Sequence, residues 1–169
     1  MKIVFTELTD HADLIRNAFP DDELVIFDRP LDERQLVDAS ANAEIISVFI
    51  YTPVTSAVID SLPSLKLIAT RSVGFDHVAA KYAIEKGIIV CHVPDYGSHV
   101  VAEHVFALLL ACARKITSAN AFVKDERRFD FSPFLGQELM DKTLGVVGTG
   151  KIGAAVIDIA EGFGMKIVA

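Results

Sequence analysis

Thr143-Leu144-Gly145-Val146-Val147-Gly148-Thr149-Gly150-Lys151-Ile152-Gly153 is the stretch that decides the fold. Its apolar first half predicts a short buried strand, and its second half places Gly148, Gly150 and Gly153 as G-x-G-x-x-G. A helix with one apolar face follows, because apolar residues recur at helical spacing: Ile152, Ala155, Val156, Ile159, Ala160 and Phe163. A strand, a glycine turn and a helix in this order are the context that a dinucleotide-binding fingerprint requires.

Each glycine of the fingerprint has its own physical task. Gly148 permits the tight turn out of the strand, and Gly150 lets a diphosphate approach the backbone. Gly153 lets the helix pack close to the strand. The free N–H groups at the start of the helix then face the phosphates, and the helix dipole favours their negative charge.

Two other interpretations of the stretch remain open. Gly145 to Lys151 also spells the start of a Walker A loop, but that motif needs Ser or Thr next and this chain has Ile152. The glycines could also serve only to pack a helix on a sheet.

The acidic residue that binds the adenosine ribose is expected about 20 positions on, at Met165–Ala169, where none occurs. We therefore expect the chain to end inside a nucleotide-binding unit, which leaves NAD and NADP undistinguished.

Composition limits the class of protein. The chain has 169 residues, of which 51% are hydrophobic and 23% charged, as in a globular protein with a well-packed core. A net charge of −7 argues against nucleic acid or an anionic membrane as a partner. The N-terminus lacks the features of a signal peptide, and the longest apolar run, Val105–Ala113, is too short to span a bilayer. Cys91 and Cys112 are interpreted as reduced core thiols, so we expect a cytoplasmic protein.

Short apolar runs alternate with helical patterns over the first half of the chain. Strands are predicted near residues 3–5, 24–27, 45–50, 67–70 and 88–91, and helices near 10–19, 32–39, 55–62 and 76–86. This alternation predicts an α/β fold with a parallel sheet covered on both faces, in a flavodoxin-like layout. The domain boundary is predicted near residue 98, which gives domains 1–98 and 99–169, the second holding the first β-α-β portion of a Rossmann domain.

Ligands of such sheets bind beyond the carboxyl ends of the strands. The loop Arg71–Asp76 is the most informative one there, because Gly74 could adopt a positive φ and let the N–H groups of Ser72 to Gly74 converge on an anion. Asp76 is predicted to cap the next helix. The loop could bind a substrate carboxylate or be an ordinary turn, and the residues alone favour neither interpretation.

From Val100 the pattern changes to a helix that is apolar on most sides, as in helices buried between domains or subunits. The charged and aromatic segment 124–136 that follows is predicted to be an arm packed against something. His99, Glu103 and His104 lack the H-x-x-E-H spacing of a zinc site, so we expect capping or interface packing and no metal.

Four motifs together resemble one family, the NAD-dependent, D-isomer-specific 2-hydroxyacid dehydrogenases, and most closely its D-lactate dehydrogenase branch. Their order and spacing match over essentially the whole chain: Arg71–His77, Val93–Ser98, Val101–His104 and Thr143–Gly153. The resemblance implies a substrate domain followed by an NAD-binding Rossmann domain. It also implies that the backbone amides of Ser72, Val73 and Gly74 bind the carboxylate of a 2-keto acid.

Further roles follow from the same resemblance. Tyr51 and Tyr96 would line the substrate site, and Lys151 and Ile152 would lie over the NAD diphosphate together with Gly148, Gly150 and Gly153. The helix Val100–Thr117 and the arm Lys124–Met140 resemble the family's homodimer contact. The family's catalytic Arg, Glu and His match no residue of this chain, so no catalytic residue is assigned.

The resemblance implies an oxidoreductase that interconverts a pyruvate-like 2-keto acid and a D-2-hydroxy acid by hydride transfer. We expect the 169-residue chain to be truncated and inactive alone. The alternatives are a non-catalytic dimerisation or association module, and a fragment that binds a keto acid without reacting.

Overall fold

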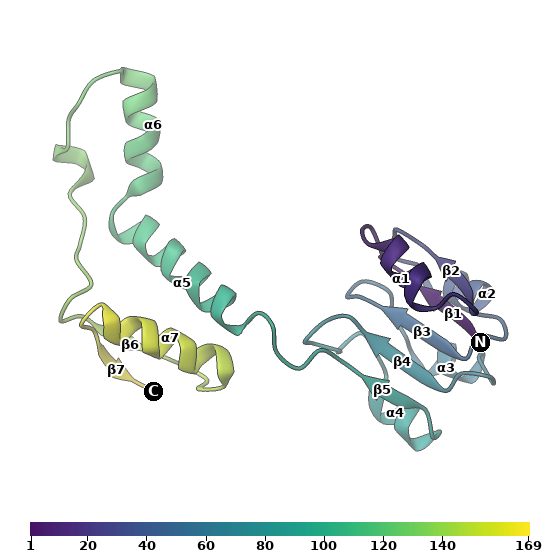
Figure 1. Cartoon of the computed structure of the whole chain (residues 1–169). Helices are drawn as coiled ribbons and strands as arrows, with labels where there is room; N and C mark the ends of the chain where they lie inside the picture. The colour runs from purple at the N-terminus through teal and green to yellow at the C-terminus, as the bar shows by residue number, and fades with distance from the viewer. The chain divides into compact units, whose positions relative to one another are not determined.

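The computed structural model describes all 169 residues, and the chain divides into two compact units, Met1–Asp95 and Tyr96–Ala169 (Figure 1). The first unit is built on a sheet of five parallel strands: β1 (Lys2–Phe5), β2 (Glu23–Ile26), β3 (Ile45–Val48), β4 (Leu67–Thr70) and β5 (Ile89–Cys91). Their order in the sheet is β2-β1-β3-β4-β5. This is the flavodoxin-like order, so the predicted fold class of the first unit is confirmed.

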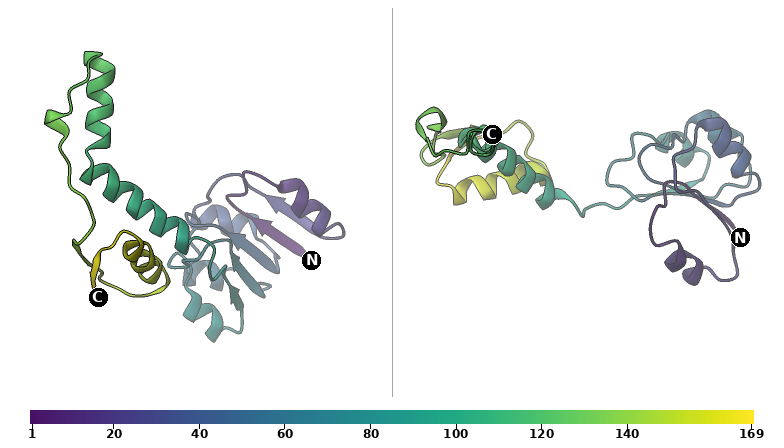
Figure 2. Two further views of the ribbon diagram at one scale, coloured as in Figure 1. Left: turned by 60° about the vertical axis from the view of Figure 1, so that its left-hand side comes forward. Right: turned by 90° about the horizontal axis from the view of Figure 1, so that it is seen from above.

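Helices cover both faces of this sheet. Figure 2 shows α2 (Glu33–Ala39), α3 (Ser56–Asp60) and α4 (Ala80–Glu85) on one face and α1 (Ala12–Ala18) on the other. The main core lies under α2, α3 and α4, because alternate strand residues point to that face. Its fully buried members include Val4, Leu36, Ile46, Val58 and Ile68.

The helix predicted over 76–86 begins later than expected. It spans Ala80–Glu85 with Ala79 at its N-cap and no side-chain cap, so the prediction that Asp76 caps it was wrong. The preceding residues pair with another segment instead: the N–H of Val54 donates to the carbonyl of His77, and the N–H of Ala79 donates to the carbonyl of Val54. A backbone held extended by this bridge cannot also form the first helical turn.

The second unit contains α5 (Ser98–Ala113), α6 (Ile116–Glu126), a short 3-10 helix η1 (Ser132–Phe134), β6 (Thr143–Gly145), α7 (Lys151–Gly162) and β7 (Lys166–Val168). β6 and β7 pair in parallel and α7 connects them, which forms the predicted β-α-β portion. Its core joins α5 to α7 through Ala102, Phe106, Ala155, Val156 and Ala160. The rings of Phe106 and Phe163 stack with centroids 5.2 Å apart.

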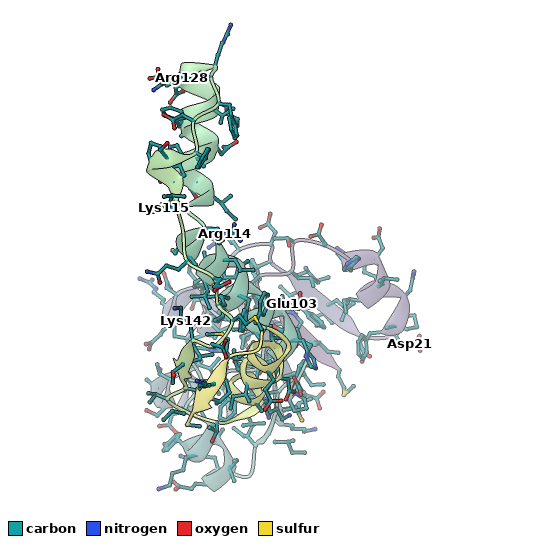
Figure 3. All side chains as sticks on the ribbon, turned by 90° about the vertical axis from the view of Figure 1, so that its left-hand side faces the viewer. Asp21, Glu103, Arg114, Lys115, Arg128 and Lys142 are labelled. Atoms are coloured by element: carbon teal, nitrogen blue, oxygen red, sulfur yellow. The ribbon has the colours of Figure 1, made fainter.

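The helix predicted to run from Val100 to Thr117 is broken. α5 ends at Ala113, and Lys115 has a left-handed backbone with φ of 53° before α6 begins. The break is explained by a contact with a later segment, because the carbonyl of Ala113 accepts a hydrogen bond from the N–H of Gln137 at 2.9 Å. Figure 3 shows Arg114 and Lys115 at this junction, with Arg128 beyond the far end of α6. Residues 124–126 of the predicted arm are therefore the last turn of α6.

The two cysteines are more exposed than the sequence predicts. Cys91 and Cys112 are both free and exposed, so the prediction that they are core thiols was wrong. Cys91 ends β5, an edge strand, and Cys112 lies in the last turn of α5. Neither unit contains a helix with the length and apolarity needed to cross a membrane.

Candidate functional site

The carboxyl edge of the five-stranded sheet brings three loops together. The chain reverses its direction of winding between β1 and β3, so the ends of these two strands form the topological switch point of the sheet. The loop after β3 holds Phe49, Ile50, Tyr51 and Thr52, and the loop after β4 holds Arg71 to Gly74. The two loops are in contact, because Oγ of Ser72 lies 3.4 Å from the carbonyl oxygen of Phe49.

Three successive amides after β4, those of Ser72, Val73 and Gly74, form what we name the Ser72 nest. No hydrogen bond within the chain is donated by any of these three N–H groups. Ser72 is buried, and its hydroxyl donates to the carbonyl of Gly74 at 2.7 Å, which fixes the bend of the loop. Gly74 does not adopt the positive φ that a glycine allows, so the bend is stabilised by the serine hydroxyl and not by a left-handed glycine.

A histidine supports the Ser72 nest from the neighbouring strand. Nδ1 of His92, just after β5, lies 2.9 Å from the carbonyl oxygen of Val73. The imidazole also packs edge-on against Phe75, with ring centroids 5.0 Å apart. The N–H of Val93 donates to the carbonyl of Ser72. The carbonyl oxygens of Ser72 and Val73 are thus hydrogen-bonded, while the N–H groups of the Ser72 nest have no acceptor within the chain.

The loop after β3 contrasts with the Ser72 nest, because its four amides are all occupied. We name the backbone N–H groups of Phe49 to Thr52 the Glu7 nest, since all four donate to the carboxylate of Glu7. Oε1 accepts from Ile50 and Tyr51 at 3.3 and 2.9 Å, and Oε2 accepts from Phe49 and Thr52 at 3.3 and 3.1 Å.

The charge state of Glu7 follows from these contacts. Burial disfavours the ionised carboxyl, but the hydrogen bonds from Tyr51 and Thr52 outweigh it and hold the pKa of Glu7 below its ordinary value. Glu7 is therefore an anion at neutral pH.

The side chain of Arg71, which follows β4, connects the carboxyl ends of β1 and β3. Its guanidinium donates to the hydroxyl of Ser47 at 2.8 Å and to the carbonyls of Thr6 and Glu7. Burial lowers the pKa of Arg71 from its usual value, and the charge of Glu7 counteracts that effect. Because Arg71 immediately precedes Ser72, it holds the start of the Ser72 nest against β1 and β3.

Sequence reasoning named Tyr51, Ser72, Val73, Gly74 and Tyr96 for the substrate. The first four lie at the ends of β3 and β4, where Tyr51 is 72% exposed and Val73 41% exposed. Tyr96 is the first residue of the second unit and is 62% exposed.

The residues named for the cofactor lie in the second unit. β6 ends at Gly145, and α7 begins at Lys151 with Gly150 as its N-cap. Gly148 has a φ of 94°, a left-handed conformation that disfavours other residues. A β-carbon at Gly153 would lie 2.1 Å from the carbonyl oxygen of Gly148, so only glycine allows α7 to start so close to the strand. A β-carbon at Gly150 would meet no atom within 4 Å, which leaves space for a diphosphate at the first turn.

His99, Glu103 and His104 make no common site, and no group of three or more His, Cys, Asp or Glu side chains in the chain could hold a metal ion. Sequence reasoning missed Glu7. An acidic residue two positions after the first strand of a sheet with order 2-1-3-4-5 lies at the switch point, and that placement could have drawn attention to it.

Comparison with known proteins agrees with these geometries. Residues 3–122 match the catalytic domain of the D-isomer specific 2-hydroxyacid dehydrogenases, and residues 106–169 match the NAD-binding domain of the same family. The chain is 41% identical over 138 residues to a D-3-phosphoglycerate dehydrogenase of Methanocaldococcus jannaschii, which covers 82% of this chain and 26% of that protein. It is 36% identical over 148 residues to a hydroxypyruvate reductase of Thermotoga maritima, covering 88% of this chain and 48% of that protein.

A solved structure extends the similarity to the fold. The D-lactate dehydrogenase of Aquifex aeolicus, complexed with NAD and lactic acid, superposes with a TM-score of 0.86 at 38% identity, over 98% of this chain and 50% of that one. The chain thus spans between about a quarter and about half the length of these relatives. The matching domains, the glycine bend and the sheet order give one conclusion: the chain belongs to the D-isomer specific 2-hydroxyacid dehydrogenase family, and its second unit is part of an NAD-binding domain.

Proposed function

We propose that this chain carries the keto-acid-binding unit and the diphosphate-binding turn of an NAD-dependent oxidoreductase that interconverts a pyruvate-like 2-keto acid and a D-2-hydroxy acid. The observation that carries the proposal is the Ser72 nest, whose three amides have no acceptor within the chain. Unpaired amides at the carboxyl ends of parallel strands suit a carboxylate. Tyr51 and Tyr96 line the bound substrate in this proposal, and residues 1–98 form the substrate domain.

The cofactor half of the proposal concerns the turn Gly148–Gly153. The diphosphate of NAD is bound there by the first amides of α7, with Lys151 and Ile152 over it. The open space at Gly150 and the close approach at Gly153 support this role. Catalysis requires groups that no residue here matches, so we propose that the 169-residue chain alone transfers no hydride.

The keto-acid site is tested by nuclear magnetic resonance on the isotope-labelled chain. Pyruvate is expected to shift the amide signals of Ser72, Val73 and Gly74 in a saturable manner, and pyruvamide, its neutral analogue, is expected to leave them in place. Equal shifts with both ligands would contradict carboxylate capture. In a separate assay, steady oxidation of NADH with pyruvate or glyoxylate would contradict the proposed inactivity.

A second candidate function is association, and a specific observation favours it. Large apolar side chains of the second unit are exposed on α5, α6 and the segment after them: Val100, Val101, Leu108, Ile116, Val123, Phe129, Phe131, Leu135 and Met140. So much exposed apolar surface is typical of an interface. A homodimer through α5 and the segment 124–140 would cover it. Light scattering gives the test, because a monomer at all concentrations would contradict it.

A further inference from the structure

We propose that Glu7 is a positioning residue for the keto-acid site: its carboxylate acts as a built-in anion that fills the switch point between β1 and β3. Because the Glu7 nest is filled, the Ser72 nest is left as the open position for the carboxylate of a ligand at this edge. The inference rests on the proposed function in one respect, namely that the Ser72 nest binds that carboxylate.

The geometry at the switch point is that of an occupied anion site. Open α/β sheets bind ligands in the crevice where the strand order reverses. Here Glu7 leaves the end of β1 and accepts the amides of Phe49 to Thr52 from the end of β3. Each carboxylate oxygen accepts two hydrogen bonds, which approaches the full accepting capacity of the group. A second anion would find these four donors already used.

The backbone of Glu7 is held in an unusual conformation to make this possible. Its φ is 55°, in the left-handed region that side chains disfavour. Its N–H donates to the carbonyl of Arg29 at 3.1 Å, and its carbonyl accepts from Nη2 of Arg71 at 3.2 Å. Backbone strain that neighbours maintain on both sides is typical of sites where a side chain has a task.

The consequence for the ligand is twofold. The hydrogen bond from Tyr51, at 2.9 Å the shortest of the four, fixes the backbone from which its exposed ring projects. The negative charge of Glu7 also repels a carboxylate from the Glu7 nest and directs it to the neighbouring strand end. Glu7 need not touch the ligand for either effect.

The Glu7→Gly variant gives the sharpest test, because glycine accepts a φ of 55° without strain and leaves room for a small anion. The amide signals of Phe49 to Thr52 are followed in the whole chain, wild type and variant, while formate is added; formamide is the neutral control. In the variant, these signals are expected to move upfield. Formate, but not formamide, should return them toward their wild-type positions in a saturable way. In the wild type formate should leave them unchanged.

Titration of the same two proteins with pyruvate separates this inference from the proposed function. Pyruvate is expected to shift only the Ser72 nest in the wild type and both nests in Glu7→Gly. If the Ser72 nest never responds but formate fills the Glu7 nest of the variant, the proposed function fails and the built-in anion is upheld. The inference would be overturned if the amide signals of Phe49 to Thr52 did not change on substitution, or if formate did not shift them in the variant.

A wild-type measurement covers the case in which Glu7→Gly does not fold. On acidification the amide signals of Phe49 to Thr52 should titrate together, with the same midpoint as the side-chain carboxyl carbon of Glu7. Arg71, the charged group beside Glu7, stays protonated over this range. Amides that titrate with a different midpoint, or not at all, would also overturn the inference.

Discussion

The carbonyl oxygen of Gly148 occupies the space that a β-carbon at Gly153 would need, with only 2.1 Å between them. The carbonyl carbon of Gly148 would be 3.1 Å away. Both atoms belong to the backbone, so a side chain at position 153 could be accommodated only by moving α7 away from the end of β6. Gly150, three residues earlier, has no such neighbour.

Gly153→Ala is therefore expected to destabilise the second unit by about 1–3 kcal/mol, the usual cost of inserting a methyl group into a packed position. Gly150→Ala is the matched control and should cost less, about 0.5–1 kcal/mol, because its methyl group meets no atom and only the N-cap preference for glycine over alanine is lost. Urea unfolding followed by circular dichroism measures both. Equal losses in the two variants would contradict the close approach.

A calorimetric NADH titration of Gly150→Ala should show weakened binding, because its methyl group takes the space of the diphosphate.

A similar contact fixes the junction of α5 and α6. A β-carbon at Gly136 would lie 2.3 Å from the carbonyl oxygen of Ala113 and 3.0 Å from the α-carbon of Arg114. Gly136→Ala should break the hydrogen bond from Gln137 to Ala113, so the amide of Gln137 is expected to exchange its hydrogen at least about tenfold faster, for a local loss of ~1.4 kcal/mol. Gly97→Ala, where a β-carbon meets nothing within 4 Å, is the control and should leave that exchange rate unchanged.

More of the fold than of the site could be predicted from the sequence. Alternating strands and helices were enough for the parallel sheet, and the glycine spacing was enough for the turn between β6 and α7. Both patterns are local, because side-chain periodicity and turn chemistry act over neighbouring residues.

The two helix errors and the failure to notice Glu7 share one cause, a contact between residues far apart in the chain. Asp76 fails to cap α4 because the segment after it pairs with Val54, and α5 stops at Ala113 because Gln137 binds that carbonyl. Glu7 went unnoticed because its four donors lie more than forty residues away, at Phe49 to Thr52. No periodicity in a single sequence records such pairings.

Acid should weaken the first unit partly through Glu7. Its pKa is lowered in the folded chain, so its carboxylate contributes stability above the unfolded value of about 4.3 and loses that contribution as the pH falls through the folded value. At pH 7 we expect Glu7→Gln to be about 1–3 kcal/mol less stable than the wild type, since its amide group leaves amides of the Glu7 nest without an acceptor.

Comparing the wild type with Glu7→Gln separates the effect of Glu7 from that of other acids. The pKa values of Glu44 and Asp60, for example, are also lowered, by hydrogen bonds from Lys66 and Lys86. Urea midpoints of wild type and Glu7→Gln should lie well apart at pH 7 and approach each other below about pH 4. A gap that stays constant down to pH 3 would show that the Glu7 charge has no part in it.

Arg71 is the remaining group on which the strand ends depend. Arg71→Met keeps an unbranched apolar stem but removes the guanidinium, which leaves the hydroxyl of Ser47 and the carbonyls of Thr6 and Glu7 without their donor. Unsatisfied buried acceptors cost about 1–3 kcal/mol each, reduced where water enters, so a total loss of about 2–4 kcal/mol is expected. Arg34→Met is the matched control: Arg34 is 93% exposed and pairs with Asp38 at 3.9 Å, a contact that contributes below about 0.5 kcal/mol. Unfolding in urea measures both variants. Because Arg71 precedes Ser72, the amide signals of the Ser72 nest should shift in Arg71→Met and stay in place in Arg34→Met. Similar stability losses in the two variants would mean that Arg71 does not hold these strand ends together.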